Sequence, residues 1–113
     1  MTKVLQLIDG LPTVVDVLTV TLTDAESGNV MSYDASYKFA VITYSIERDT
    51  ITETGRLQVS QKNSNISMTQ DSSSIGDTGI ILSATLNGSV EINYTATATG
   101  NDGTFKYSIN KWF

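Results

Sequence analysis

The chain has 113 residues, of which 40% are hydrophobic and 17% are charged, and this suits one globular domain. It contains no Cys and no His, which excludes disulfides, thiolate nucleophiles, imidazole bases and the usual zinc sites. The net charge is −5 and the seven Lys and Arg residues are scattered, so neither nucleic acid nor an anionic membrane is an expected partner.

The first residues, MTKVLQLIDGLP, carry one Lys and a short, interrupted apolar run, so they predict no secretion signal. No stretch approaches the roughly 18 consecutive apolar residues of a membrane span. We therefore expect a protein made in a cytoplasm and not exported by a signal of its own.

Alternation of apolar and polar residues dominates the chain, and no segment has sustained helical spacing. The alternation predicts strands at about 3–8, 13–23, 36–48, 55–61, 65–69, 79–86, 90–98 and 104–112. Polar stretches with turn-forming residues predict turns between them, including 24–29, 48–55, 62–65 and 71–77. Strands at roughly 10-residue spacing predict an all-β fold, an antiparallel β-sandwich or jelly-roll-like single domain over residues 1–113.

The run from Tyr37 to Ile46 is apolar on both of its faces. One face carries Tyr37, Phe39 and Val41, and the other carries Ala40, Ile42, Tyr44 and Ile46. A sandwich buries only one face of each sheet, so the second apolar face needs a cover. Either the strand lies beneath other elements of the chain, or this face meets another subunit.

The pair Asn87-Gly88 predicts a hairpin. A two-residue turn would place apolar side chains beside polar ones, whereas a three-residue loop at 86–88 matches the faces. The second arrangement predicts the pairs Ala84 with Val90, Leu82 with Ile92 and Ile80 with Tyr94. It also predicts a positive φ at Gly88, where glycine is at no disadvantage.

The last strand places Phe105, Tyr107 and Ile109 on one side, and we expect them to form one buried face with Tyr94. Trp112 falls on the opposite side. Two large aromatics at a chain end expose apolar surface unless something holds them, either their own core or a neighbouring subunit. The candidate subunit-interface residues are therefore Tyr37, Phe39, Val41, Trp112 and Phe113.

No set of residues predicts catalysis. Glu47, Asp49 and Glu53 are the nearest approach to an acid/base pair, but they lie in a turn-like segment where acids cap or face water. Oxygen ligands in DSSSIGD and GNDG suit calcium, yet neither has the spacing of a known calcium loop and turn chemistry explains both. We expect no enzyme activity, no cofactor and no metal site.

Four segments resemble a known family when taken in order: YKFAVITYSIERD, TGRLQVS, GDTGIILSATLNGSVEINYTATATG and GTFKYSINKW. Together they resemble a small β module of tailed-bacteriophage virion structural proteins. That module often ends tail-fibre and other structural proteins of marine phages. The resemblance covers about residues 36–112 and leaves residues 1–35 uncovered.

The resemblance implies a non-catalytic structural protein of a virion that is present in many copies and forms a homo-oligomer, commonly a trimer. Because the module is nearly the whole chain here, a small capsid decoration or cement subunit, or a head or tail accessory, is the expected role. Residues 1–23 are then a possible arm or strand that contacts capsid or tail proteins by strand addition. The alternative is a module that binds glycans or the host surface, with Tyr33, Tyr37 or Trp112 as stacking platforms.

Overall fold

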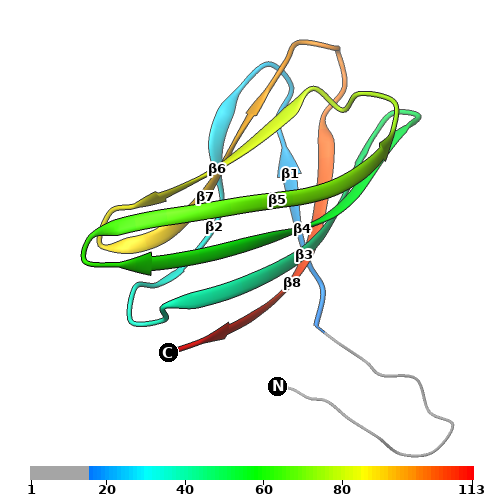
Figure 1. Cartoon of the computed structure of the whole chain (residues 1–113). Helices are drawn as coiled ribbons and strands as arrows, with labels where there is room; N and C mark the ends of the chain where they lie inside the picture. Colours follow the sequence, from blue (N-terminus) through cyan, green and yellow to red (C-terminus); the bar gives the residue numbers. More distant parts are fainter. Residues whose placement is uncertain (1–15) are drawn as a thin grey trace, which may run out of the picture.

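Two antiparallel sheets pack face to face in the computed structural model, which describes residues 16–113 (Figure 1). The larger sheet has the strand order β1-β8-β3-β4-β5 and the smaller has the order β2-β7-β6. The strands are β1 Leu18–Leu22, β2 Ser27–Asp34, β3 Phe39–Arg48, β4 Ile51–Lys62, β5 Asn65–Ile75, β6 Ile80–Leu86, β7 Ser89–Ala96 and β8 Gly103–Trp112. The predicted β-sandwich is confirmed. The predicted strand at 3–8 lies outside the described residues.

The core lies between the two sheets and is built from alternate residues of the central strands. In β3 the buried side chains include Ala40, Ile42, Tyr44 and Ile46, which form one of the two apolar faces that the sequence predicted. Phe105 of β8 is fully buried beside them and stacks on Tyr44 with ring centroids 5.3 Å apart. The smaller sheet faces them with Val90, Ile92 and Tyr94 of β7. Because inner residues are apolar and most outer ones polar, period-two alternation explains the sandwich.

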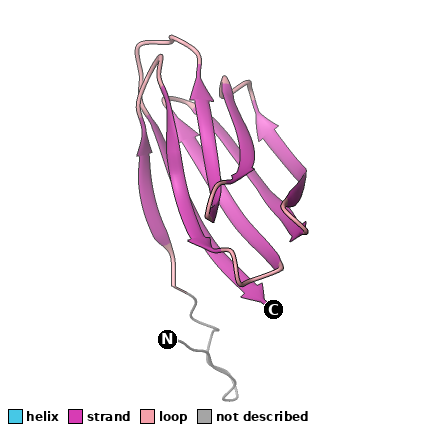
Figure 2. Ribbon diagram, turned by 90° about the vertical axis from the view of Figure 1, so that its left-hand side faces the viewer, coloured by secondary structure: helices cyan, strands magenta, loops and turns pink. Residues whose placement is uncertain are grey.

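The turns gather at the two ends of the sandwich, as Figure 2 shows. Arg48 pairs with Ile51, so only Asp49 and Thr50 form the turn between β3 and β4. The predicted turn at 48–55 was therefore too long. Asp49 takes a positive φ of 57°, which Asp tolerates better than most residues and which lets the hairpin close at once.

Two other segments predicted as turns are strands. β2 includes part of 24–29, and β5 runs through most of 71–77. β2 was missed because its register shifts between Asn29 and Met31, which breaks the alternation. The serines of β5 were misread because they lie on an exposed edge strand, where polar side chains face water on both sides.

The β6–β7 hairpin has a three-residue loop, and Gly88 has a φ of 74°, as predicted. The predicted pairs are wrong by two residues, because Leu82 pairs with Tyr94 and Leu86 pairs with Val90. The loop is therefore 87–89. A shift of two keeps every side chain on its face, so alternation alone does not separate the two registers.

The last strand does not form a hairpin with β7. β8 lies in the larger sheet between β1 and β3, and β7 lies in the smaller one. Tyr94 therefore belongs to the opposite side of the core from Phe105 and Tyr107 and does not share a face with them, and Ile109 is only partly buried. The predicted common face becomes two opposed faces.

The predicted N-terminal arm at 1–23 falls mostly on residues outside the described part of the chain. Its described end is a strand of the domain itself, since Leu18–Leu22 pairs with β8. Leu22 is fully buried in the core. Within residues 16–113 there is no helix long and apolar enough to cross a membrane.

Candidate interaction surface

Aromatic side chains gather at the end of the sandwich where β3 begins and β8 finishes. Phe39 and Trp112 are direct cross-strand partners, and their rings stack with centroids 5.8 Å apart. Tyr37 stacks on Phe113 at 4.8 Å, with only 11° between the ring planes. The exposed fractions of Phe39, Trp112 and Phe113 are 43%, 48% and 76%. We call these four residues the aromatic end.

The five predicted interface residues lie close together, but Val41 is less exposed than Phe39, Trp112 and Phe113. Trp112 lies on the outer face with Phe39, as its position in the alternation predicted. Val41 is on the same face, opposite Asn110, but is half-buried. The five residues therefore divide between the outer face of the larger sheet and its rim, where Tyr37 and Phe113 lie.

Backbone and amide hydrogen bonds hold the aromatic end in place. The backbone N–H of Lys38 donates to the carbonyl of Trp112 at 3.0 Å, which ties the last strand to the start of β3. Gln61 is buried, and its side-chain amide donates to the carbonyl of Tyr37 at 2.9 Å and also to that of Ala35. The turn that carries Tyr37 is therefore fixed before any partner binds.

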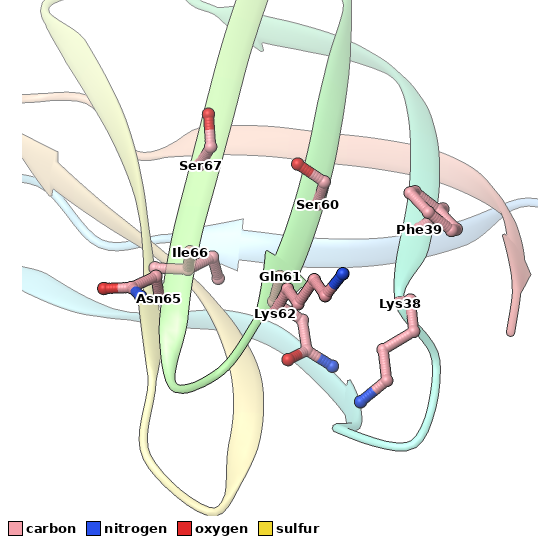
Figure 3. A pocket seen from close by; sticks show the side chains of 8 residues that line it. All are labelled: Lys38, Phe39, Ser60, Gln61, Lys62, Asn65, Ile66 and Ser67. Atoms are coloured by element: carbon pink, nitrogen blue, oxygen red, sulfur yellow. The ribbon is translucent and has the colours of Figure 1, made fainter.

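A hollow of about 440 Å³ opens beside the aromatic end (Figure 3). Figure 3 shows that its side chains come from the start of β3, the end of β4 and the start of β5. They are Lys38, Phe39, Ser60, Gln61, Lys62, Asn65, Ile66 and Ser67. A second hollow, of about 380 Å³, shares Phe39, Ser60 and Ser67 and reaches Trp112. The surface thus combines flat aromatic rings, hydroxyls, two amides and two ammonium groups.

Sequence reasoning found the aromatics but missed the cations. Lys38 and Lys62 are far apart in the chain, and the β3–β4 pairing brings them to the same hollow. Lys111 does not line this hollow but lies beside the aromatic end, with its Nζ 5.1 Å from the centroid of the Tyr37 ring. In the sequence the only signal was that Lys38 and Lys111 each adjoin an aromatic residue, because strand pairing is needed to bring Lys38 and Lys62 to one hollow.

The opposite end of the sandwich is closed by a buried arginine. Arg48 is 3% exposed, and its Nη2 lies 2.6 Å from Oδ1 of Asp24. Its other N–H groups donate to the carbonyls of Thr78 at 2.8 Å and Asn101 at 2.9 Å. Asp24 also accepts the backbone N–H of Thr99 at 2.8 Å. The Arg48 side chain therefore bonds to three loops, those that contain Asp24, Thr78 and Asn101.

The acids considered for catalysis do not form a pair. Glu53 accepts hydrogen bonds from the hydroxyl of Tyr44 at 2.6 Å and from that of Thr78 at 3.2 Å. Burial, and then the hydrogen bond to Glu53, raise the pKa of Tyr44 to about 12, so this hydroxyl keeps its proton at neutral pH. Glu47 and Asp49 are exposed. Within residues 16–113, no three acidic side chains come together in a way that could hold a metal ion.

The three aromatic residues considered as glycan platforms have different surroundings. Tyr33 is buried, with 7% exposed, so no sugar ring can stack on it. Tyr37 is partly buried, because Phe113 lies on its ring. Trp112 is half exposed and remains available for stacking.

No protein-family model, curated protein or solved structure matches the chain.

Proposed function

We propose that this chain is a non-catalytic structural subunit of a tailed-phage virion. In this role it is a small capsid decoration or cement protein, or a head or tail accessory, and it docks onto capsid or tail proteins. The aromatic end carries the proposal, because its large apolar side chains are exposed and a backbone hydrogen bond of the chain itself ties its two strands together. Its purpose is to bind protein partners and not to transform a substrate.

The composition of the aromatic end supports contact with protein. Aromatic anchors surrounded by polar groups are typical of the centres of protein interfaces. Phe39 and Trp112 supply the anchors, and Ser60 and Ser67 lie around them. The neighbouring Lys38 and Lys62 favour a partner that presents carboxylates at the rim.

The test is to expose purified tailed-phage particles lacking this chain to the purified protein and to measure bound copies by sedimentation with the particles. We expect saturable binding by the natural chain and at least about tenfold weaker binding by Trp112→Ser, since aromatic anchors at interface centres contribute most of the affinity. Ile81→Ser is the matched control, because Ile81 is an exposed apolar residue on the smaller sheet. No binding, or equal losses in both variants, contradicts the proposal.

A second candidate function is recognition of host-surface glycans. The hollow that Phe39 and Trp112 help to line favours it, because sugar rings stack on flat aromatics and the nearby Ser60, Ser67 and Thr69 carry hydroxyls. A glycan array separates the two functions. Binding to a defined glycan that is lost in Trp112→Ser and kept in Ile81→Ser supports recognition, and an array without hits removes it.

A further inference from the structure

The edge strand β5 lacks the features that normally protect a sheet edge. It has 11 residues, Asn65–Ile75, and every residue from Thr69 onward is exposed. It contains no Pro, no Lys and a single charged residue, Asp71. Its register with β4 runs from Lys62–Asn65 to Thr52–Ile75 without a shift. A long, regular edge of low charge is a template for pairing with another strand.

The other edge strands differ from β5. β1 has 5 residues and β6 has 7, so each offers a short edge. β2 is interrupted by the register shift between Asn29 and Met31, which disturbs the spacing of its edge groups. Short length and bulges are both known means of preventing edge-to-edge pairing. β5 alone among the described edges has neither.

The turn before β5 tells which of its backbone groups face outward. Asn63 and Ser64 both have positive φ, 53° and 66°, and they join the paired residues Lys62 and Asn65. Such a two-residue turn closes on a pair that exchanges both hydrogen bonds, and such pairs then recur at every second residue. The N–H and C=O groups directed away from β4 therefore belong to Ile66, Met68, Gln70, Ser72 and Ser74.

We propose that β5 pairs antiparallel with β5 of a second copy of this chain, about a twofold axis at Gln70. Gln70 is the midpoint of Asn65–Ile75, so this register overlaps the whole strand. It places Met68 opposite Ser72 and Ile66 opposite Ser74, and about ten backbone hydrogen bonds then form between the copies. The two larger sheets become one continuous sheet, and inner side chains stay beside inner ones.

Charge also fits a second copy in this register. Asp71 faces Thr69 of the other chain and not its own equivalent, so like charges are not opposed. Within its own chain, Asp71 has Arg56 as its cross-strand partner. The length, the face pattern and the single charge of β5 are thus self-complementary, as a twofold contact requires. This dimer does not rest on the proposed function and uses none of the four residues of the aromatic end, although Asn65, Ile66 and Ser67 of β5 also line the hollow beside it.

A cysteine cross-link tests the register directly, because the chain contains no Cys of its own. Gln70→Cys places two thiols on the axis, where paired Cα atoms are ~5.5 Å apart and a disulfide can form. We expect rapid oxidation to a covalent dimer, while Thr43→Cys, exposed on the outer face of β3, stays monomeric under the same conditions. Cross-linking of Gln70→Cys no faster than of Thr43→Cys overturns the proposal.

A second pair of variants guards against a local effect at Gln70, whose side chain bonds to Tyr44. Ile66→Cys and Ser74→Cys should cross-link when mixed, and neither should cross-link efficiently alone.

Sedimentation velocity of the natural chain should show a species of twice 12.2 kDa that dissociates on dilution. Thr69→Asp, which faces Asp71 of the other copy, should weaken the dimer about fivefold compared with Thr69→Asn. A monomer at every concentration overturns the proposal.

Discussion

The two ends of strand β3 differ in burial and in chemistry. At its last residue, Arg48 is buried and bonds to Asp24 and to loop carbonyls, so that end is closed within the chain. At its first residue, Phe39 is 43% exposed and stacks on a tryptophan that is also half exposed. The closed end satisfies its polar groups internally. The aromatic end leaves apolar surface that no other part of residues 16–113 covers.

This difference predicts that the closed end matters mainly for the stability of the fold and the aromatic end mainly for association. Removing one partner of a buried, hydrogen-bonded ion pair strongly lowers the stability of the folded protein, because the other charge stays buried without compensation. Exposed aromatics add little to folding but are the side chains that dominate binding at interfaces. Variants at the closed end should therefore affect folding, and variants at the aromatic end should affect association. The following tests separate the two effects.

The largest expected effect is at the closed end. Arg48→Met leaves the carboxylate of Asp24 and the carbonyls of Thr78 and Asn101 without their donor, and we expect it to lower the free energy of unfolding by about 3 kcal/mol. Urea denaturation measures this loss. Arg56→Met is the control, because Arg56 is exposed and should change stability by less than about 0.5 kcal/mol. Equal effects of the two substitutions contradict the role of Arg48.

The next effect is alkaline destabilisation through Tyr44, whose pKa is raised from 10.0 to about 12. The unfolded chain ionises this group first as the pH rises. Its contribution is therefore fully present below pH 10.0 and is lost as the pH rises toward about 12. Tyr44→Phe should reduce the alkaline loss measured by denaturation at several pH values. Some loss should remain, because burial also raises the pKa values of Tyr33 and Tyr107. An unchanged pH profile contradicts the burial of this hydroxyl.

A smaller effect on folding is expected at the aromatic end. Trp112→Ser removes one stacked pair, and we expect a loss of about 1 kcal/mol in the free energy of unfolding. Its effect on particle binding should be much larger than its effect on folding. Thermal denaturation and particle sedimentation, measured on the same preparation, provide the comparison. A large loss of stability with unchanged binding would mean that Trp112 is a core residue.

The smallest effect is acid destabilisation through aspartates at the two ends. The pKa of Asp24 is lowered mainly by the backbone N–H of Thr99, against an opposing effect of desolvation, and further by Gly100 and Arg48. The pKa of Asp34 is lowered by Ser36 alone. Each contribution is present above the unfolded value of 3.8 and is lost as the pH falls through the lower folded value.

Asp24→Asn should flatten the acid dependence of stability more than Asp34→Asn does, because Asp24 has more partners. Denaturation midpoints measured between about pH 5 and 2, the range over which paired carboxylates protonate, give the two slopes. The reverse order would show that the closed end is not the more strongly bonded one.

The sequence predicted what depends on local alternation. The grouping of Ala40, Ile42, Tyr44 and Ile46 on one face of β3 and the position of Trp112 on the opposite side from Tyr107 follow from period two, and the positive φ of Gly88 follows from glycine's freedom. These features need only neighbours in the chain. The sandwich itself follows from them, because two one-sided sheets must cover each other.

What the sequence did not predict depends on pairing between distant strands. The β6–β7 register was wrong by two because both registers keep the same faces. β7 and β8 were expected to share a face, but alternation does not say which sheet a strand joins. The convergence of Lys38 and Lys62 and the bonds of Arg48 are likewise results of topology, so they could not be read from spacing.

The central claim is that the aromatic end is a contact surface in a virion. Electron cryomicroscopy of tailed-phage particles assembled in cells that produce this chain tests it most directly. The account predicts density for the sandwich on the particle, with Phe39 and Trp112 against another protein. Particles without the chain, or copies whose Phe39 and Trp112 face solvent, would contradict it.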